Sequence, residues 1–279
     1  MIPLFGLAPL GFLEVGPPDL IALAAETGFA SVNLRTRPAV PGGAAFPIAP
    51  GSELMRACRR RIAATGVRVL AIEQVGLDRT TDVPALRAML EAGAELGASR
   101  VLCSGDEPDL GLLAQRFAEL CRLAEEFGMA VDLEFMPFRA LKTLEDAVRV
   151  VTASGAENGW VCLDALHLFR SGGSVEALGA VDPERLGPLQ LCDAPRHPPP
   201  PNALAEEARE RRLLPGRGQL PLAELLKVYP AQRPIDAEIP MTRAFPDLDA
   251  ADRARLIAAA MRECLQRLEP GPAGTAGSV

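Results

Sequence analysis

The strongest constraint on the fold is an alternation of short apolar runs and longer amphipathic segments along most of the 279 residues. The segments with the 3.6-residue period of helices are Pro18–Thr27, Glu53–Thr65, Val83–Leu96, Leu110–Phe127, Thr143–Ser154, Val175–Ala180, Pro221–Val228 and Asp249–Leu268. The strand-like runs are Leu4–Ala8, Ser31–Leu34, Val67–Gln74, Arg100–Ser104, Ala130–Phe135, Trp160–Asp164, Pro188–Cys192 and Ile235–Ile239. Glycines such as Gly28 and Gly66, directly after a periodic segment, are typical of helix C-termini.

Eight strand–helix units in about 250 residues favour a single-domain (β/α)8 TIM barrel. We place this domain at residues 1–269, and a doubly wound open sheet is the alternative. Residues 194–212 contain four consecutive prolines and then a charged run, which indicates a long loop with a short helix inside it. Residues 270–279 have no apolar pattern, and we expect a disordered tail there.

Composition disfavours several classes of protein. The chain has 29 basic and 36 acidic residues, a net charge of −7, and no run of Lys or Arg that would bind a nucleic-acid backbone. No apolar stretch approaches the roughly 20 residues of a membrane span, and the apolar N-terminus has no basic segment before it, so we interpret it as a first strand. Six cysteines without a CxxC pair indicate neither a disulfide scaffold nor a zinc finger, and we expect a cytoplasmic protein.

Polar residues end four consecutive strand-like runs: Glu134, Asp164, Gln190 and Glu238. The C-terminal strand ends form the open face of a βα barrel, where catalytic groups lie. Strand alternation points Glu134 and Asp164 inward, and three converging carboxylates would repel one another without a cation. Oxygen ligands suit one Mg²⁺ or Mn²⁺ ion, whereas the plain alternative is that these are ordinary polar residues at strand ends.

Several motifs together resemble those of the xylose-isomerase-like sugar phosphate isomerase/epimerase superfamily. The motifs are Glu134-Phe-Met-Pro-Phe, Leu163-Asp164-Ala-Leu-His167, Leu189-Gln190-Leu-Cys-Asp193, Leu214-Pro-Gly-Arg-Gly218 and Ala237-Glu238. The resemblance implies a metal-dependent barrel whose ligands are Glu134, Asp164, Gln190 and Glu238. Many sugar epimerases carry histidine where this chain has Gln190, and here the motif looks more like that of bacterial 3-dehydroshikimate dehydratases. The resemblance also implies that His167, in the loop after the sixth strand, is an active-site acid/base or a substrate ligand. An ordinary histidine pKa near 6.5 suits proton transfer at neutral pH.

Substrate-binding residues are expected around the mouth of the barrel. Arg212 and Arg217 are candidates because arginine binds a carboxylate or phosphate with two parallel hydrogen bonds. Arg212, with Arg211 and the neighbouring Arg209, could equally form a solvated helix face. Glu73, at the end of the third run, is a further candidate for the pocket.

The leading functional hypothesis is an enzyme that forms a metal-stabilised enolate or enediolate on a ketose, an inosose or a hydroxylated keto acid. Isomerisation or epimerisation would use Glu134 and Glu238 as proton carriers on opposite faces of the substrate. The alternative is a 3-dehydroshikimate dehydratase giving protocatechuate, with His167 as the base, and a remote alternative is a ligand-binding barrel without turnover. The DNA-repair endonucleases of the same superfamily need several histidines, and this chain has two. Apolar positions on Asp249–Leu268 would suit either the core or a homodimer interface.

Overall fold

Residues 5–267 are described by a computed structural model, and they form a closed barrel of eight parallel strands. The first strand pairs with both the second and the eighth, so the predicted barrel is confirmed and an open doubly wound sheet is excluded. The strands are β1 (Phe5–Leu7), β2 (Ser31–Arg35), β3 (Arg68–Leu77), β4 (Arg100–Gly105), β5 (Ala130–Glu134), β6 (Gly159–Asp164), β7 (Leu186–Leu191) and β8 (Ile235–Ala237).

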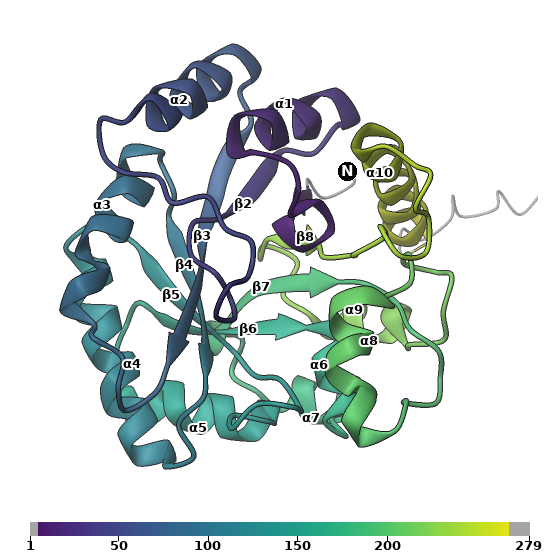
Figure 1. Ribbon diagram of the computed structural model, residues 1–279. Coiled ribbons are helices and arrows are strands. Elements are labelled where there is room, and N and C mark those ends of the chain that lie inside the picture. The colour runs from purple at the N-terminus through teal and green to yellow at the C-terminus, as the bar shows by residue number, and fades with distance from the viewer. Residues whose placement is uncertain (1–4, 268–279) are drawn as a thin grey trace, which may run out of the picture.

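Helices surround the strands as an outer layer (Figure 1). All eight predicted helical segments contain a helix: α1 (Pro17–Thr27), α2 (Glu53–Thr65), α3 (Arg87–Glu95), α4 (Leu110–Glu125), α5 (Leu144–Ser154), α7 (Val175–Gly179), α9 (Leu222–Val228) and α10 (Ala250–Gln266). Short 3₁₀ helices cover Pro9–Phe12, Pro84–Leu86, Pro183–Arg185 and Pro201–Ala203.

Two additional helices lie in the loops at the C-terminal ends of the strands. The helix α8 (Leu204–Glu210) is the short helix predicted within the long loop after β7. The helix α6 (Ala165–Arg170) was not predicted, because its residues continue the apolar run of β6 without a glycine or proline between them. It begins where the Asp164 side chain accepts a hydrogen bond of 2.9 Å from the His167 amide.

Local sequence signals account for the ends of several helices. Ser52 accepts a hydrogen bond of 3.1 Å from the Met55 amide at the start of α2, and Thr143 accepts one of 3.2 Å from Asp146 at the start of α5. Gly66 ends α2 with a φ of 73°, a left-handed conformation that glycine adopts without steric cost.

Strand alternation separates the apolar layer from a polar barrel interior. Val131 and Leu133 of β5 are fully buried in the apolar core, whereas Asp132 and Glu134 line cavities inside the barrel. Below the C-terminal strand ends, Asp132 accepts hydrogen bonds of 2.6 and 2.5 Å from Arg100. Arg100 therefore pairs with Asp132 in this interior layer, and the neighbouring Asp236 accepts a hydrogen bond of 2.9 Å from Asn33.

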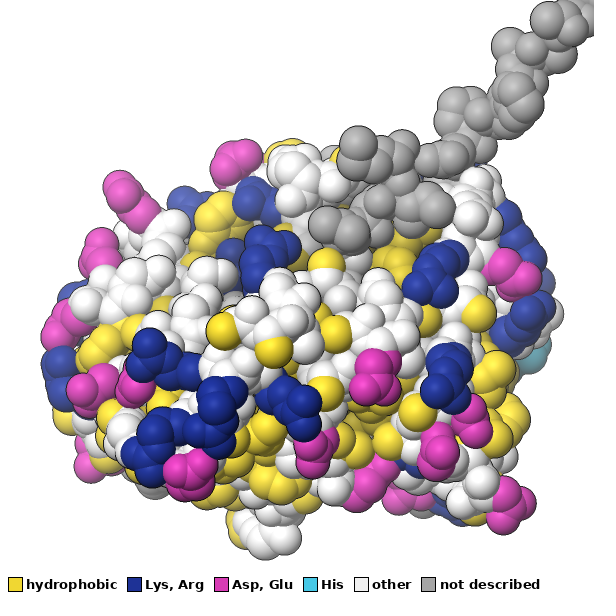
Figure 2. Space-filling view, turned by 90° about the horizontal axis from the view of Figure 1, so that it is seen from above, with side chains coloured by type: hydrophobic (Ala, Val, Ile, Leu, Met, Phe, Trp, Pro, Cys, Tyr) yellow, Lys and Arg dark blue, Asp and Glu magenta, His cyan; other side chains and the backbone are white. Residues whose placement is uncertain are grey.

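Charged side chains of both signs share the surface seen in Figure 2. On the face in Figure 2, basic side chains are interspersed with acidic ones. On α2, for example, Arg56 and Arg60 both contact Glu53.

All six cysteines are free and buried. Within residues 5–267, no helix combines the length and the apolar character needed to cross a bilayer. The predicted tail at 270–279 lies outside the described residues.

Candidate active site

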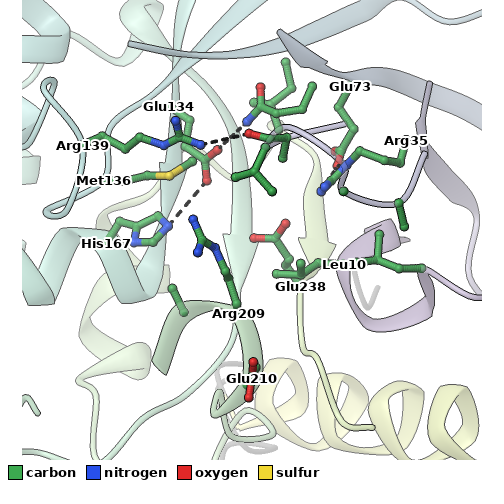
Figure 3. A pocket seen from close by; sticks show the side chains of 18 of the residues that line it. Leu10, Arg35, Glu73, Glu134, Met136, Arg139, His167, Arg209, Glu210 and Glu238 are labelled. Atoms are coloured by element: carbon green, nitrogen blue, oxygen red, sulfur yellow. Dashed lines mark hydrogen bonds and ion pairs between the residues drawn. The ribbon is translucent and has the colours of Figure 1, made fainter. Parts of the chain in front are cut away.

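A cavity of about 290 Å³ opens at the C-terminal ends of the strands (Figure 3). Its charged lining includes Glu73 of β3, Glu134 of β5, and Glu238, which directly follows β8. His167 of α6 and Arg212, which follows α8, complete the polar wall. The volume suits a small molecule, and the polar groups converge from several strands, as catalytic groups do in barrels of this kind.

Arg212 is a buried cation between two carboxylates. Its Nη1 lies 2.5 Å from Asp164 Oδ2 and 3.1 Å from Glu238 Oε2, and its Nε donates to the Ala208 carbonyl oxygen at 2.7 Å. The Arg212 side chain is 2% exposed, so these interactions are shielded from solvent. Arg212 is therefore buried in the interior, where it forms ion pairs with two of the predicted metal ligands.

The loop that carries Arg212 is fixed by Asp193. The Asp193 carboxylate accepts backbone hydrogen bonds of 2.8–3.0 Å from Ala194, Gly216, Gly218 and Leu220. A Cβ atom at Gly218 would lie 2.3 Å from Asp193 Oδ1, so only glycine fits there. The Leu-Cys-Asp and Pro-Gly-Arg-Gly motifs therefore form one structural unit that sets the path of the loop.

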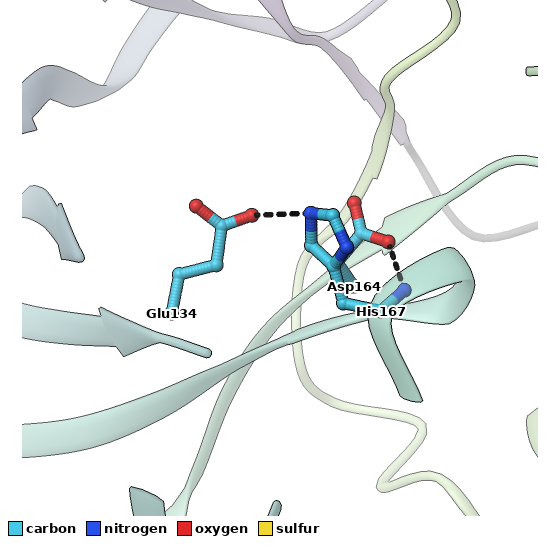
Figure 4. A group of neighbouring side chains, drawn as sticks. All are labelled: Glu134, Asp164 and His167. Atoms are coloured by element: carbon cyan, nitrogen blue, oxygen red, sulfur yellow. Dashed lines mark hydrogen bonds and ion pairs between the residues drawn. The ribbon is translucent and has the colours of Figure 1, made fainter. Parts of the chain in front are cut away.

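Glu134 lies between Gln74 and His167. Gln74 Nε2 donates to Glu134 Oε2 at 3.3 Å, and His167 Nε2 lies 3.8 Å from Glu134 Oε1. Ligand atoms of Glu134, Asp164 and His167 all lie within 4.8 Å of one another, close enough to hold one metal ion (Figure 4).

Burial and the charge of Arg212 shift the pKa values of the carboxyl groups in opposite directions. Burial, reinforced by Asp164, raises the pKa of Glu134 to about 8, and burial raises the pKa of Glu238 far above its usual range. Burial would also raise the pKa of Asp164, but Arg212 and His167 together outweigh this effect and lower the pKa to about 2.

The charge balance fits a divalent cation. Glu134, Asp164 and Glu238 bring three negative charges around the single positive charge of Arg212, which leaves an excess of two when all are ionised. A divalent cation would neutralise this excess and return the raised carboxyl pKa values toward the ionised form.

His167 is held as a neutral imidazole. Burial is the main cause that lowers the pKa of His167, to about 4, and it outweighs the negative charge of Asp164, which would raise this pKa. Its ring packs edge-on against Phe138 at 5.5 Å between ring centroids. Within the described residues Nδ1 is buried without a hydrogen-bond partner, and Nε2 is the nitrogen directed at Glu134.

Two predicted site residues lie elsewhere. Arg217 does not line the cavity: its side chain is 58% exposed and pairs with Glu263 of α10, because the turn anchored by Asp193 directs it outward. In this structure the Arg217 guanidinium therefore lies outside the cavity. Gln190 is buried beside Asp164 in strand register but lines a smaller interior cavity, where its Oε1 accepts a weak hydrogen bond of 3.5 Å from Cys162 Sγ.

Glu73 lines the cavity as predicted, although Arg35 engages one of its oxygens at 2.7 Å. The residues of the cavity that were not singled out from the sequence include Gln74, Phe138 and Arg139. Phe138 ends the Glu-Phe-Met-Pro-Phe motif, which was the available signal for it. Gln74 and Arg139 have no comparable signal, because only the fold brings them beside Glu134 and His167.

Comparisons with known proteins agree with this fold. A family model described as "Xylose isomerase-like TIM barrel" matches residues 21–266. An inosose isomerase from Bacillus velezensis is 28% identical over 111 residues, which are 39% of this chain and 38% of that protein, so the match spans well under half of the relative.

Solved structures share the fold at low sequence identity. An IolI protein with a bound zinc atom has a TM-score of 0.76 at 18% identity, covering 96% of this chain and 99% of that one. The probable 3-DHS dehydratase AsbF from Bacillus anthracis has a TM-score of 0.71 at 13% identity, covering 97% and 100%. A D-psicose 3-epimerase from Clostridium cellulolyticum H10 has a TM-score of 0.70 at 16% identity, with the same coverage.

Proposed function

Because the chain belongs to the xylose isomerase-like TIM barrel family, we propose that it is a metal-dependent isomerase or epimerase of a small polyhydroxylated carbonyl compound. One observation supports this most directly: Glu134 and Glu238 are both buried and enter the same cavity from different sides (Figure 3). Moving a proton between two carbons, or between two faces of one carbon, needs an acid and a base placed in this way. The substrate class is a ketose, an inosose or a hydroxylated keto acid.

The proposed metal ligands are Glu134, Asp164, Glu238 and Gln190. The excess negative charge of the carboxylates favours a divalent cation, and oxygen ligands favour Mg²⁺ or Mn²⁺. A cation held there would supply Lewis-acid polarisation of the substrate carbonyl. Gln190 would have to exchange its contact with Cys162 for the cation, and a thiol is a weak donor that gives up such a contact at small cost.

The remaining side chains either hold the carboxylates in position or contact the substrate. Arg212 keeps Asp164 ionised and fixes the position of Glu238. Glu73 Oε2 is buried without a partner among the described residues, and it would accept a hydrogen bond from a substrate hydroxyl. Gln74 fixes Glu134 by donating to one of its oxygens, which leaves the other oxygen toward His167.

Proton exchange with solvent tests this proposal. The full chain, stripped with EDTA and then reloaded with Mn²⁺, is incubated in D₂O with ketoses, inososes and hydroxypyruvate, and deuterium incorporation is followed by NMR. We expect metal-dependent exchange at the carbon next to a carbonyl, and its loss in E134Q and E238Q. Mn²⁺ binding without exchange in any of these compounds would favour a ligand-binding barrel instead.

Dehydration is the second candidate reaction, and the place of His167 in the wall of the cavity favours it. An imidazole beside the substrate can accept a proton from a substrate carbon before a β-hydroxyl group leaves. Incubation of the Mn²⁺-loaded protein with 3-dehydroshikimate, with and without EDTA, tests this reaction by ultraviolet absorbance. Metal-dependent growth of an aromatic band would identify a dehydratase, and a flat trace would leave isomerisation or epimerisation.

A further inference from the structure

One arginine in the cavity wall has no acidic partner within residues 5–267. Four arginines line the cavity: Arg35, Arg139, Arg209 and Arg212. Arg35 pairs with Glu73, Arg139 pairs with Asp106, and Arg212 is held between Asp164 and Glu238. Arg209 forms neither an ion pair nor a hydrogen bond through its guanidinium in the described part of the chain, so its charge is available to a ligand.

The glutamates of its own helix do not neutralise Arg209. Glu206 of α8 contacts Arg211 and Arg243, each at 2.6 Å. Glu210 also contacts Arg243. The third glutamate of the helix, Glu207, is buried and pairs with Arg170 at 2.7 Å. The acidic side chains nearest in sequence are therefore each engaged by an arginine other than Arg209.

Arg209 lies directly at the approach to His167. Its Cζ atom is 5.8 Å from the centre of the Phe138 ring, and the same ring packs edge-on against His167. The guanidinium points from α8 into the cavity (Figure 3). Contact with an aromatic ring restricts the arginine side chain and leaves its N–H groups free at the edge of the guanidinium.

We propose that Arg209 binds an anionic oxygen group of the substrate, a carboxylate or a phosphate, at the end remote from the metal-binding carbonyl. This proposal rests on the proposed function for the rest of the substrate. The floor of the cavity carries excess negative charge and its mouth carries an uncompensated positive charge. A molecule with hydroxyl and carbonyl oxygens at one end and an anion at the other matches this polarity. Arg209 thus takes the role that the sequence suggested for Arg212 and Arg217.

Three compounds that share a hydroxyketone core test the proposal. Dihydroxyacetone is neutral, 5-hydroxylevulinate carries a carboxylate at the end away from its hydroxyketone, and dihydroxyacetone phosphate carries a phosphate. Their dissociation constants for the Mn²⁺-loaded full chain are measured by calorimetry for the wild type, R209Q and R211Q. Arg211 is the matched control, because it is exposed on the same segment and its partner Glu206 keeps a second arginine.

We expect at least one anionic compound to bind the wild type about tenfold more tightly than dihydroxyacetone, as one charge-assisted interaction allows. R209Q should lose this preference, and R211Q should keep it. The anion that shows the larger loss in R209Q identifies the substrate group as carboxylate or phosphate. An anion preference that persists in R209Q, or a wild type without any preference, would overturn the proposal.

The binding measurement is independent of turnover. A protein that selects an anion through Arg209 but exchanges no proton with D₂O would support the anion subsite and refute the proposed reaction. Conversely, exchange in neutral ketoses with no effect of R209Q on anion binding would refute the subsite and leave the reaction standing.

Discussion

Replacing Arg212 by methionine tests whether its charge holds the site together. Methionine keeps much of the apolar stem but removes the guanidinium from Asp164 and Glu238, both of which are almost completely buried. Breaking a buried ion pair from one side costs about 3–5 kcal/mol, since the remaining charge has no counter-charge. Proton uptake by the stranded carboxylates would lessen this loss, so we expect R212M to lose about 3 kcal/mol of unfolding free energy without metal.

The assay is urea unfolding at pH 7.5, in EDTA and then with Mn²⁺. A ligand at one hundred times its dissociation constant stabilises a folded protein by about 2.7 kcal/mol. Because R212M has more uncompensated negative charge than the wild type, we expect Mn²⁺ to raise the unfolding free energy of R212M more. R211M is the matched control, and as an exposed arginine it should change stability by less than about 0.5 kcal/mol.

Two results would refute this reasoning. A loss below about 1 kcal/mol for R212M in EDTA would show that its guanidinium does not compensate the buried carboxylates. A larger Mn²⁺ effect on the wild type than on R212M would show that the cation and Arg212 do not respond to the same charge.

Three further perturbations test individual residues. In EDTA, Glu134 binds a proton more readily in the folded chain (pKa about 8) than in the unfolded chain (4.5), so its contribution to stability is present below pH 4.5 and is lost as the pH rises through 8. The unfolding free energy from urea series should therefore fall less between pH 6.5 and pH 8 in E134Q than in the wild type. An equal fall in both proteins would contradict the raised pKa. H167N should lose proton exchange but keep its Mn²⁺ affinity, and a tenfold weaker affinity by calorimetry would make His167 a metal ligand instead. D193N should lose about 1–3 kcal/mol of unfolding free energy, and the amides of Gly216 and Gly218 should exchange hydrogen faster. Unchanged exchange at these amides would show that the Asp193 carboxylate does not anchor the loop.

The barrel fold, and the position of the carboxylates at the C-terminal ends of its strands, follow from local sequence patterns. A period of two places Glu134 and Asp164 inward, and parallel strands bring their C-terminal ends to one face of the barrel. Glycine and N-cap residues mark the ends of the intervening helices for the same local reason, since the backbone at those positions needs a special conformation or an extra acceptor. These features depend on neighbours within a few residues, and the sequence alone therefore predicted them.

The sequence alone could not assign the arginines or His167. Arg209, Arg212 and Arg217 lie within nine residues of one another, yet one lines the mouth of the cavity, one is buried between carboxylates and one faces solvent. Their positions depend on how Asp193 anchors a long loop, which is a contact between distant segments with no periodic signal. The neutral state of His167 likewise arises from burial by surrounding elements. Local pattern thus determined the barrel and the ends of its strands, and tertiary packing decided which charges face the substrate, because side-chain direction and desolvation depend on the whole fold.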